Sequence, residues 1–227
     1  MAKRTTQKKG QRQKRQESKQ REQRLRWIRL GGLIILAFGT LGIFGFYRVS
    51  SAPNVDAPLE IMAGNVIGPA GSSVRIVEFG DFGCPACRQW HNAGIKDQLI
   101  NTFGDQISFT FRHFPVITRQ SPKAAEAGQC ASEQGRFWEY HDFIYEQTSF
   151  EALAVNELKN YAAAISLDGE QFDQCLDSGK YQSYVARDQS AALAAGARGT
   201  PTFYINGQVV DFFFESMAAK IQDELDS

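Results

Sequence analysis

The chain has 227 residues, of which 43% are hydrophobic and 12% aromatic, so it can build one sizeable core and is not a disordered chain. The formal net charge is zero, but residues 1–29 hold 12 Lys/Arg against two Glu, whereas the remaining residues hold 13 Lys/Arg against 23 Asp/Glu. This asymmetry indicates that the two parts of the chain belong in different environments.

Residues 1–29 form a basic tail with almost no apolar residues, which is typical of a disordered or weakly helical segment. Its charge would suit nucleic acid, or it would set membrane topology and contact the anionic head groups of lipids. Because an apolar segment follows at once, we favour the membrane and expect no nucleic-acid partner.

Residues 30–47, LGGLIILAFGTLGIFGFY, carry no charge. Counted from Trp27 to Tyr47 the stretch has 21 residues, about 31 Å as a helix, which suffices to cross a hydrocarbon core of about 30 Å. We therefore predict a transmembrane helix that acts as an uncleaved signal anchor, with the tail in the cytoplasm by the positive-inside rule. A cleaved signal peptide is the main alternative. Ser50, Ser51 and Ala52 could mimic a cleavage site, but Pro53 follows them directly and should hinder cleavage. A buried globular helix is the second alternative.

The segment 48–70 is rich in small residues and proline and is interpreted as a linker, so one domain is expected over 71–227. In that domain SVRIVEFG is apolar on both faces, which predicts a central strand. We expect a helix from Pro85 to about Phe103 and a second strand in DQISFTFRHFPV. Strand, helix and strand together predict a βαβ unit with a parallel pair and a right-handed crossover.

A long helical region follows, from Ser121 to about Gly196, and it carries an aromatic stripe between Phe137 and Tyr145 that we expect in the core. Two strands, TPTFYI and QVVDFFF, come next, joined by Asn-Gly, which is the strongest short hairpin signal. An amphipathic helix, ESMAAKIQDELDS, closes the chain. This order resembles a thioredoxin-like α/β fold with an all-helical insertion at about 121–196.

The chain has four cysteines, Cys84, Cys87, Cys130 and Cys175. A zinc site usually needs two close pairs of ligands, and the last two cysteines are single and distant, so we expect no metal. As a redox pair, Cys84 lies just before a predicted helix, where unpaired N–H groups and the helix dipole favour its thiolate. We therefore expect Cys84 to be the nucleophile and Cys87, one turn further in, to be the resolving cysteine.

Glu78 lies six residues before Cys84, in a strand with apolar neighbours. We expect its carboxyl to point into the core beneath the dithiol, with a raised pKa that suits proton exchange with Cys87; a carboxylate turned to water is the alternative. Downstream, Pro201 begins a predicted strand and belongs at an edge or in a loop. The residues alone give little reason to expect a cis Thr200–Pro201 bond.

The stretches IVEFGDFGCPAC and GTPTFYING together resemble the DsbA family of thiol–disulfide oxidoreductases, within the thioredoxin superfamily. The resemblance extends over residues 70–227 and includes the helical insertion. It implies roles for four residues: nucleophile for Cys84, resolving cysteine for Cys87, buried acid for Glu78 and cis-proline for Pro201.

The same resemblance implies the contacts with substrate. Thr200 would offer backbone hydrogen bonds to a bound peptide, and Pro85 and Ala86 would face the substrate between the cysteines. Well-known DsbA proteins have histidine where this chain has Ala86, which can neither donate a hydrogen bond nor carry charge. We therefore expect the pKa of Cys84 to be less depressed, and the disulfide less oxidising, than in the Pro-His version.

Cys130 and Cys175 both fall in the helical region. An oxidising compartment and an even number of cysteines favour a structural disulfide between them. Two buried free thiols, or an accessory pair that relays electrons, are the alternatives. The histidines, His91, His113 and His141, are too scattered along the chain to form a triad with a cysteine, so we expect structural roles for them.

Together these features predict a membrane-tethered protein disulfide oxidoreductase in the cell membrane, with its catalytic domain outside. It would introduce disulfides into exported proteins and use no cofactor of its own. The family resemblance implies a quinone-linked membrane partner of the DsbB or vitamin K epoxide reductase type. A reductase or isomerase of the same fold is the first alternative, and a non-enzymatic peptide-binding or chaperone module is the second.

Overall fold

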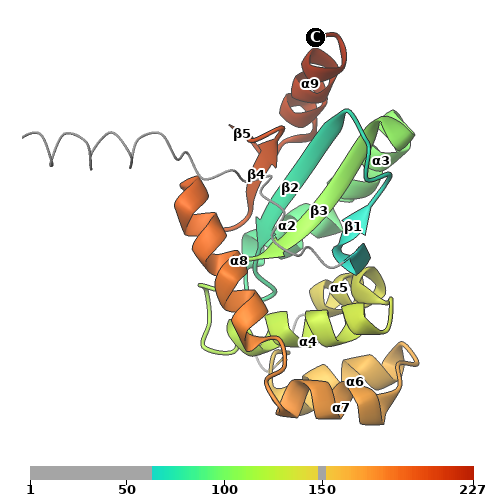
Figure 1. Ribbon diagram of the computed structural model, residues 1–227, viewed down its shortest axis with the longest axis vertical. Helices are drawn as coiled ribbons and strands as arrows, with labels where there is room; N and C mark the ends of the chain where they lie inside the picture. The colour runs from blue at the N-terminus through green and yellow to red at the C-terminus, as the bar shows by residue number, and fades with distance from the viewer. Residues whose placement is uncertain (1–62, 148–151) are drawn as a thin grey trace, which may run out of the picture. The chain divides into compact units, whose positions relative to one another are not determined.

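The computed structural model describes residues 63–147 and 152–227 (Figure 1). The predicted basic tail, the predicted membrane anchor at 30–47 and most of the predicted linker lie outside these residues. Within the described ranges, no helix is both long enough and apolar enough for a membrane crossing. The anchor therefore stays a prediction.

A sheet whose strands run in the order β1-β3-β2-β4-β5 forms the centre of the domain. The strands are Val66–Ile67 (β1), Val74–Gly80 (β2), Ile107–His113 (β3), Thr202–Ile205 (β4) and Gln208–Val210 (β5). β2 and β3 pair in parallel, and the other neighbours are antiparallel. The predicted central strand and the predicted parallel pair are confirmed.

Helices cover both faces of the sheet and form the insertion between β3 and β4 (Figure 1). They are α2 (Pro85–Asn92), α3 (Ile95–Phe103), α4 (Ser121–Glu133), α5 (Phe137–Glu146), α6 (Val155–Ala164), α7 (Gly169–Asp177), α8 (Gln182–Ala195) and α9 (Phe214–Leu225). Two short 3-10 helices, Ala63–Asn65 and Gly104–Gln106, precede β1 and β3.

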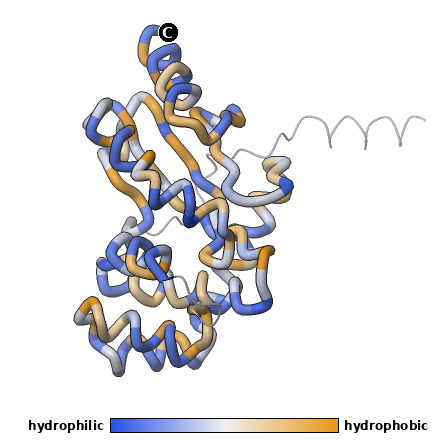
Figure 2. The backbone as a smooth tube through the Cα atoms, turned by 180° about the vertical axis from the view of Figure 1, so that it is seen from behind, coloured by the Kyte–Doolittle hydropathy of each residue, from blue (hydrophilic) through white to orange (hydrophobic). Residues whose placement is uncertain are grey.

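The alternation of side chains along β2 explains how the two faces are covered. Ile76 packs in a cluster with Phe109 of β3 and Met217 of α9. Phe79, on the opposite face, packs in a second cluster with Ala192 of α8. Figure 2 shows polar and apolar residues alternating along the helices, as amphipathic elements on a buried sheet require. The thioredoxin-like α/β fold with a helical insertion is therefore the observed fold.

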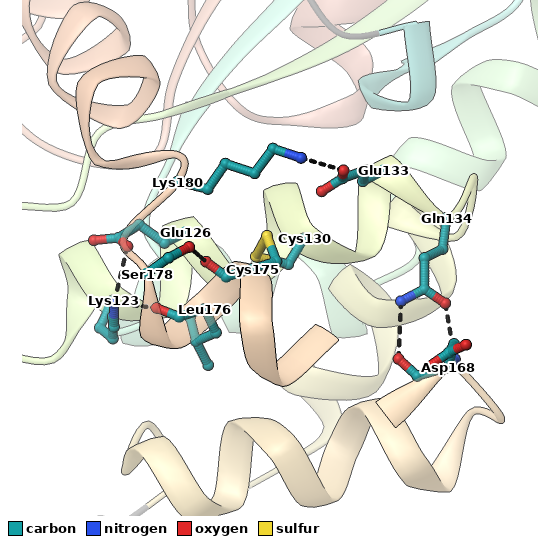
Figure 3. Close-up of a disulfide and its surroundings, with 10 residues drawn as sticks. All are labelled: Lys123, Glu126, Cys130, Glu133, Gln134, Asp168, Cys175, Leu176, Ser178 and Lys180. Carbon is teal, nitrogen blue, oxygen red and sulfur yellow. Dashed lines mark hydrogen bonds and ion pairs between the residues drawn. A yellow bond between two sulfur atoms is a disulfide. The ribbon is translucent and has the colours of Figure 1, made fainter. Parts of the chain in front are cut away.

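The insertion has its own apolar core, which is continuous with the region beneath the two active-site thiols. Tyr140 of α5 and Phe172 of α7 are fully buried there. Cys130 of α4 and Cys175 of α7 form the disulfide that the sequence favoured, with Cα atoms 5.8 Å apart (Figure 3). The insertion is thus fastened internally by a covalent bond as well as by packing.

The helix predicted after the first strand differs from the sequence-based expectation because a glycine interrupts it. The single helix predicted from Pro85 to Phe103 is two helices, α2 and α3, since Gly94 adopts a left-handed conformation with φ of 65°. Gly135, with φ of 72°, separates α4 from α5 in the same way. The break between α2 and α3 turns the second half of the predicted helix toward α9.

The ends of the sheet also differ from expectation. Part of the predicted linker belongs to the domain, because β1 pairs with β3. At the other edge, β5 ends at Val210, so the strand predicted through DFFF is wrong. Phe212 and Phe213 are 46% and 57% exposed, and Phe214 already begins α9. The pairing of strands in the folded domain decides where β1 and β5 begin and end. The hydropathy of the sequence alone does not reveal this pairing.

Candidate active site

Cys84 caps the helix that follows β2. Its backbone N–H donates to the Asp81 carbonyl at 2.9 Å, which closes the turn after the strand. The next residue, Pro85, occupies the first helical position, where its missing N–H costs nothing. The Cys87 N–H then donates to Cys84 Sγ at 3.4 Å. The Cys84 sulfur therefore sits at the positive end of α2, the position that the sequence predicted for it.

The loop before β4 lies against this sulfur. The Thr200–Pro201 peptide bond is cis, and the Cys84 thiol donates to the Thr200 carbonyl at 3.1 Å. β4 pairs with β2 antiparallel, with Thr202 opposite Phe79, and this pairing carries the loop to the active-site end of the sheet. Cys84 and Thr200, which the family resemblance assigned to one site, are thus adjacent in space.

The two thiols have pKa values shifted in opposite directions. The side-chain hydrogen bond with Cys87 is the largest cause that lowers the pKa of Cys84 to about 6, against the opposing effect of burial. Burial is the main reason that the pKa of Cys87 is raised, with the Cys84 hydrogen bond and the Glu78 charge adding to it. Cys84 is 3% exposed and Cys87 is fully buried. Cys84 therefore ionises at a lower pH than Cys87.

Glu78 is the buried acid of the site. It is 1% exposed, and burial raises its pKa to about 8, although Lys96 lowers it in part and Cys84 raises it further. The Glu78 carboxyl is closely packed, since even a Cβ atom added to Gly80 would lie 3.0 Å from Glu78 Oε1 and 2.4 Å from the Phe111 ring. The carboxyl is therefore neutral at pH 7 and able to donate a proton.

Asp81 is an organising residue that the sequence analysis did not assign. One carboxylate oxygen accepts from the Gly83 N–H at 2.7 Å. The other accepts from the N–H groups of Val116 and Ile117, each at 2.8 Å. Its buried side chain thus ties the turn before Cys84 to the loop after β3. An Asp-x-Gly directly after a strand signals an Asx turn, which would have singled it out.

The remaining residues fall into three places. Pro85 and Ala86 are exposed beside Cys84, where a substrate would meet them. Cys130 and Cys175 lie in the insertion, joined to each other. His91 and His141, which we interpreted as scattered, lie with ring centroids 5.4 Å apart. The functional roles assigned to these residues stay predictions.

This geometry defines a class of protein. A helix-capping thiol of low pKa, next to a buried thiol of high pKa, exchanges a disulfide with other dithiols, because the thiolate is both the nucleophile and the better leaving group. The profile of a family described as Thioredoxin matches residues 62–223. The chain belongs to the thioredoxin family.

Similar proteins fall into two groups. The chain is 32% identical over 170 residues to a probable disulfide bond formation protein D of Bacillus anthracis, across 70% of this chain and 77% of that protein. Oxidised BdbD from Bacillus subtilis has a TM-score of 0.66 at 25% identity, across 73% of this chain and 95% of that one. The Na(+)/H(+) antiporter NhaA of Herminiimonas arsenicoxydans is 34% identical over 189 residues, but the chain spans 30% of the length of that antiporter.

Proposed function

We propose that the protein introduces disulfides into exported proteins through Cys84 and Cys87. The opposite shift of the two thiol pKa values carries the proposal, since the pKa of Cys84 is lowered to about 6 while that of Cys87 is raised. A thiolate that is stabilised in the reduced state makes the corresponding disulfide more oxidising. Disulfide transfer from the protein to its substrate is favoured for that reason.

The exchange has two steps. A substrate thiolate attacks Cys84 Sγ in the Cys84–Cys87 disulfide, the S–S bond breaks, and Cys87 leaves and takes up a proton. A second substrate thiolate then attacks the substrate sulfur of this mixed disulfide, and Cys84 leaves as a thiolate. The substrate loses two electrons and two protons, and the cysteine pair gains the two electrons.

Glu78 has a defined task in the first step. A buried Cys87 thiolate would be costly, because desolvation penalises its charge. The neutral Glu78 carboxyl supplies the proton as that sulfur leaves, and it returns to the protonated state from solvent. The peptide itself would contact the exposed Pro85 and Ala86 and the backbone of Thr200, beside cis-Pro201.

We place the protein at the cell membrane, tethered by residues 30–47, with residues 1–29 in the cytoplasm and the domain outside. The charge asymmetry of the chain supports this topology, and so does the Cys130–Cys175 disulfide, since such bonds persist in oxidising compartments. A quinone-linked membrane partner of the DsbB or vitamin K epoxide reductase type would restore the active-site disulfide.

The decisive experiment is thiol trapping of Cys84 and Cys87 in intact cells. A mostly oxidised pair is expected for the oxidase; a mostly reduced pair would overturn it in favour of a reductase or isomerase. Cys84→Ser should abolish disulfide exchange. If that variant keeps the protein's full effect on substrate folding, the function is that of a peptide-binding chaperone. Protease added outside the cells should digest the domain and spare the tail.

A further inference from the structure

Two histidines and an aspartate meet beside the helix that carries the dithiol. His91 belongs to α2, four residues after Cys87, whereas His141 and Asp142 belong to α5, which packs against α2. His91 Nδ1 lies 3.7 Å from Asp142 Oδ1, and His141 Nδ1 lies 2.7 Å from the same oxygen. The three ligating atoms all lie within 4.8 Å of one another.

We propose that His91, His141 and Asp142 form a binding site for a divalent transition-metal ion of the zinc class. Zinc binds imidazole nitrogen and carboxylate oxygen at about 2.0–2.2 Å, and tetrahedral bonds of that length separate ligand atoms by about 3.4 Å. The separations of the two histidine nitrogens from Asp142 Oδ1, 2.7 Å and 3.7 Å, lie on either side of this value. Side-chain rotation would have to bring all three separations, which are at most 4.8 Å, to this value around an ion.

The chemistry of the ligands selects the metal. Two imidazoles and one carboxylate suit Zn²⁺ and Co²⁺, whereas Ca²⁺ and Mg²⁺ prefer all-oxygen sites. Three protein ligands leave a fourth position for water. Water reaches it, because the Asp142 side chain is 39% exposed and that of His91 14%.

Both imidazoles are prepared to act as ligands. His91 Nδ1 and His141 Nδ1 both face Asp142 Oδ1, at 3.7 Å and 2.7 Å. His141 is held rigidly by ring contacts with Phe111 and Tyr145, at centroid distances of 4.9 Å and 4.8 Å. Its Nε2 is buried with no hydrogen-bond partner among the described residues, and an ion would bind at Nδ1, in place of the hydrogen bond with Asp142 Oδ1, with the ring proton on Nε2.

The ammonium group of Lys96 lies beside the proposed site and should lower its affinity for a metal ion. Its Nζ lies 3.5 Å from Asp142 Oδ2, 3.4 Å from Asp97 Oδ1 and 4.9 Å from the centre of the Trp138 ring. This buried cation neutralises Asp142 from one oxygen and leaves the other toward the imidazoles. Lys96 therefore weakens the affinity for a second cation, and its removal strengthens it.

A bound ion would join α2 of the thioredoxin half to α5 of the insertion. Because the folded chain holds the three ligands together and the unfolded chain does not, the metal stabilises the fold by mass action. The effect is independent of the direction in which the dithiol exchanges electrons. It requires only that the two helices stay packed.

The test uses the full chain with Cys84 and Cys87 oxidised, so that their thiolates cannot bind the probe. Titration with CoCl₂ should give one ion per chain, with the visible bands of tetrahedral cobalt, and ZnCl₂ should displace it and raise Tm. His91→Gln changes a partly exposed residue and should weaken binding at least about tenfold. Glu139→Gln, an exposed change on the same α5 helix, should leave binding unchanged.

Two further variants sharpen the result. Asp142→Asn should weaken cobalt binding as His91→Gln does. Lys96→Met should tighten it, because it removes a cation that lies 3.5 Å from Asp142 Oδ2. The proposal is overturned if the oxidised chain binds no stoichiometric cobalt or zinc, or if His91→Gln and Asp142→Asn both bind as the unchanged chain does. Unchanged affinity in a folded Lys96→Met variant overturns the role given to Lys96.

Discussion

The Cys84 sulfur lies 3.1 Å from the carbonyl oxygen of Thr200, although the two residues are 116 apart in the sequence. The antiparallel pairing of β2 with β4 brings them together. A thiolate that attacks Cys84 must therefore approach alongside the loop that contains cis-Pro201. Cys84 and this loop therefore form one surface.

The hydrogen bond between the two thiols controls the reactivity of Cys84. Cys87→Ala removes it, so the pKa of Cys84 should rise from about 6 toward its usual value of 9.0. Cys87→Ser keeps a donor and should give a smaller rise. The rate of iodoacetamide alkylation against pH measures both. If the pKa of Cys84 is the same in Cys87→Ala and Cys87→Ser, the hydrogen bond from the side chain at position 87 does not lower the pKa of Cys84.

Glu78 should make stability depend on pH. It is protonated in the folded protein up to about pH 8, but in the unfolded chain it ionises above about 4.5. Unfolding therefore releases a proton between these values, and stability falls as pH rises through the window. Glu78→Gln should flatten this decline in urea unfolding of the oxidised chain at pH 5, 7 and 9. The exposed control variant Glu215→Gln should keep this fall in stability with rising pH. If Glu78→Gln also keeps it, Glu78 is not the group responsible.

Asp81 should be worth more to stability than its short side chain suggests. Its carboxylate accepts three backbone N–H groups, and the amide of Asp81→Asn can replace only one of the two accepting oxygens. We expect a loss of about 1–3 kcal/mol in the free energy of unfolding, measured with urea. Asp211→Asn, an exposed change, is the control. Equal stability of the two variants would contradict this role.

The residue between Pro85 and Cys87 should tune the redox potential. Ala86 is exposed at the start of α2, and its methyl side chain offers no hydrogen bond to the Cys84 thiolate, although its backbone N–H helps to lower the pKa of Cys84. In Ala86→His, the imidazole should stabilise the reduced state and shift the equilibrium with glutathione about tenfold toward a more oxidising disulfide. Ala86→Leu adds bulk without a donor and should not. An unchanged equilibrium in the histidine variant would refute the idea.

The disulfide of the insertion should contribute to stability and not to exchange. It closes a sequence separation of 45 residues and joins α4 to α7, beside the Lys123–Glu126 and Lys180–Glu133 ion pairs (Figure 3). The double variant Cys130→Ala/Cys175→Ala should lose about 2–4 kcal/mol in urea unfolding while it oxidises a model dithiol peptide at the usual rate. A large loss of rate with stability retained would instead indicate an electron relay.

Local patterns sufficed for the redox pair and its acid. The position of Cys84 before a helix, the depth of Cys87 one turn later and the burial of Glu78 all follow from short-range spacing, because capping and strand alternation act within a few residues. Asp81 was missed although its signal is equally local. The split of the helix at Gly94 was missed because glycine is tolerated within helical patterns and only its φ reveals the break.

By itself, the sequence determined the class of chemistry: a thiolate at a helix start, a buried resolving thiol and a buried carboxyl. Only the tertiary structure decided what surrounds them. It brought Thr200 to Cys84 and Cys130 to Cys175, and it joined His91 to Asp142 across two helices. These contacts link distant segments, and they form only when burial of apolar surface offsets the entropy of closing the loops between them.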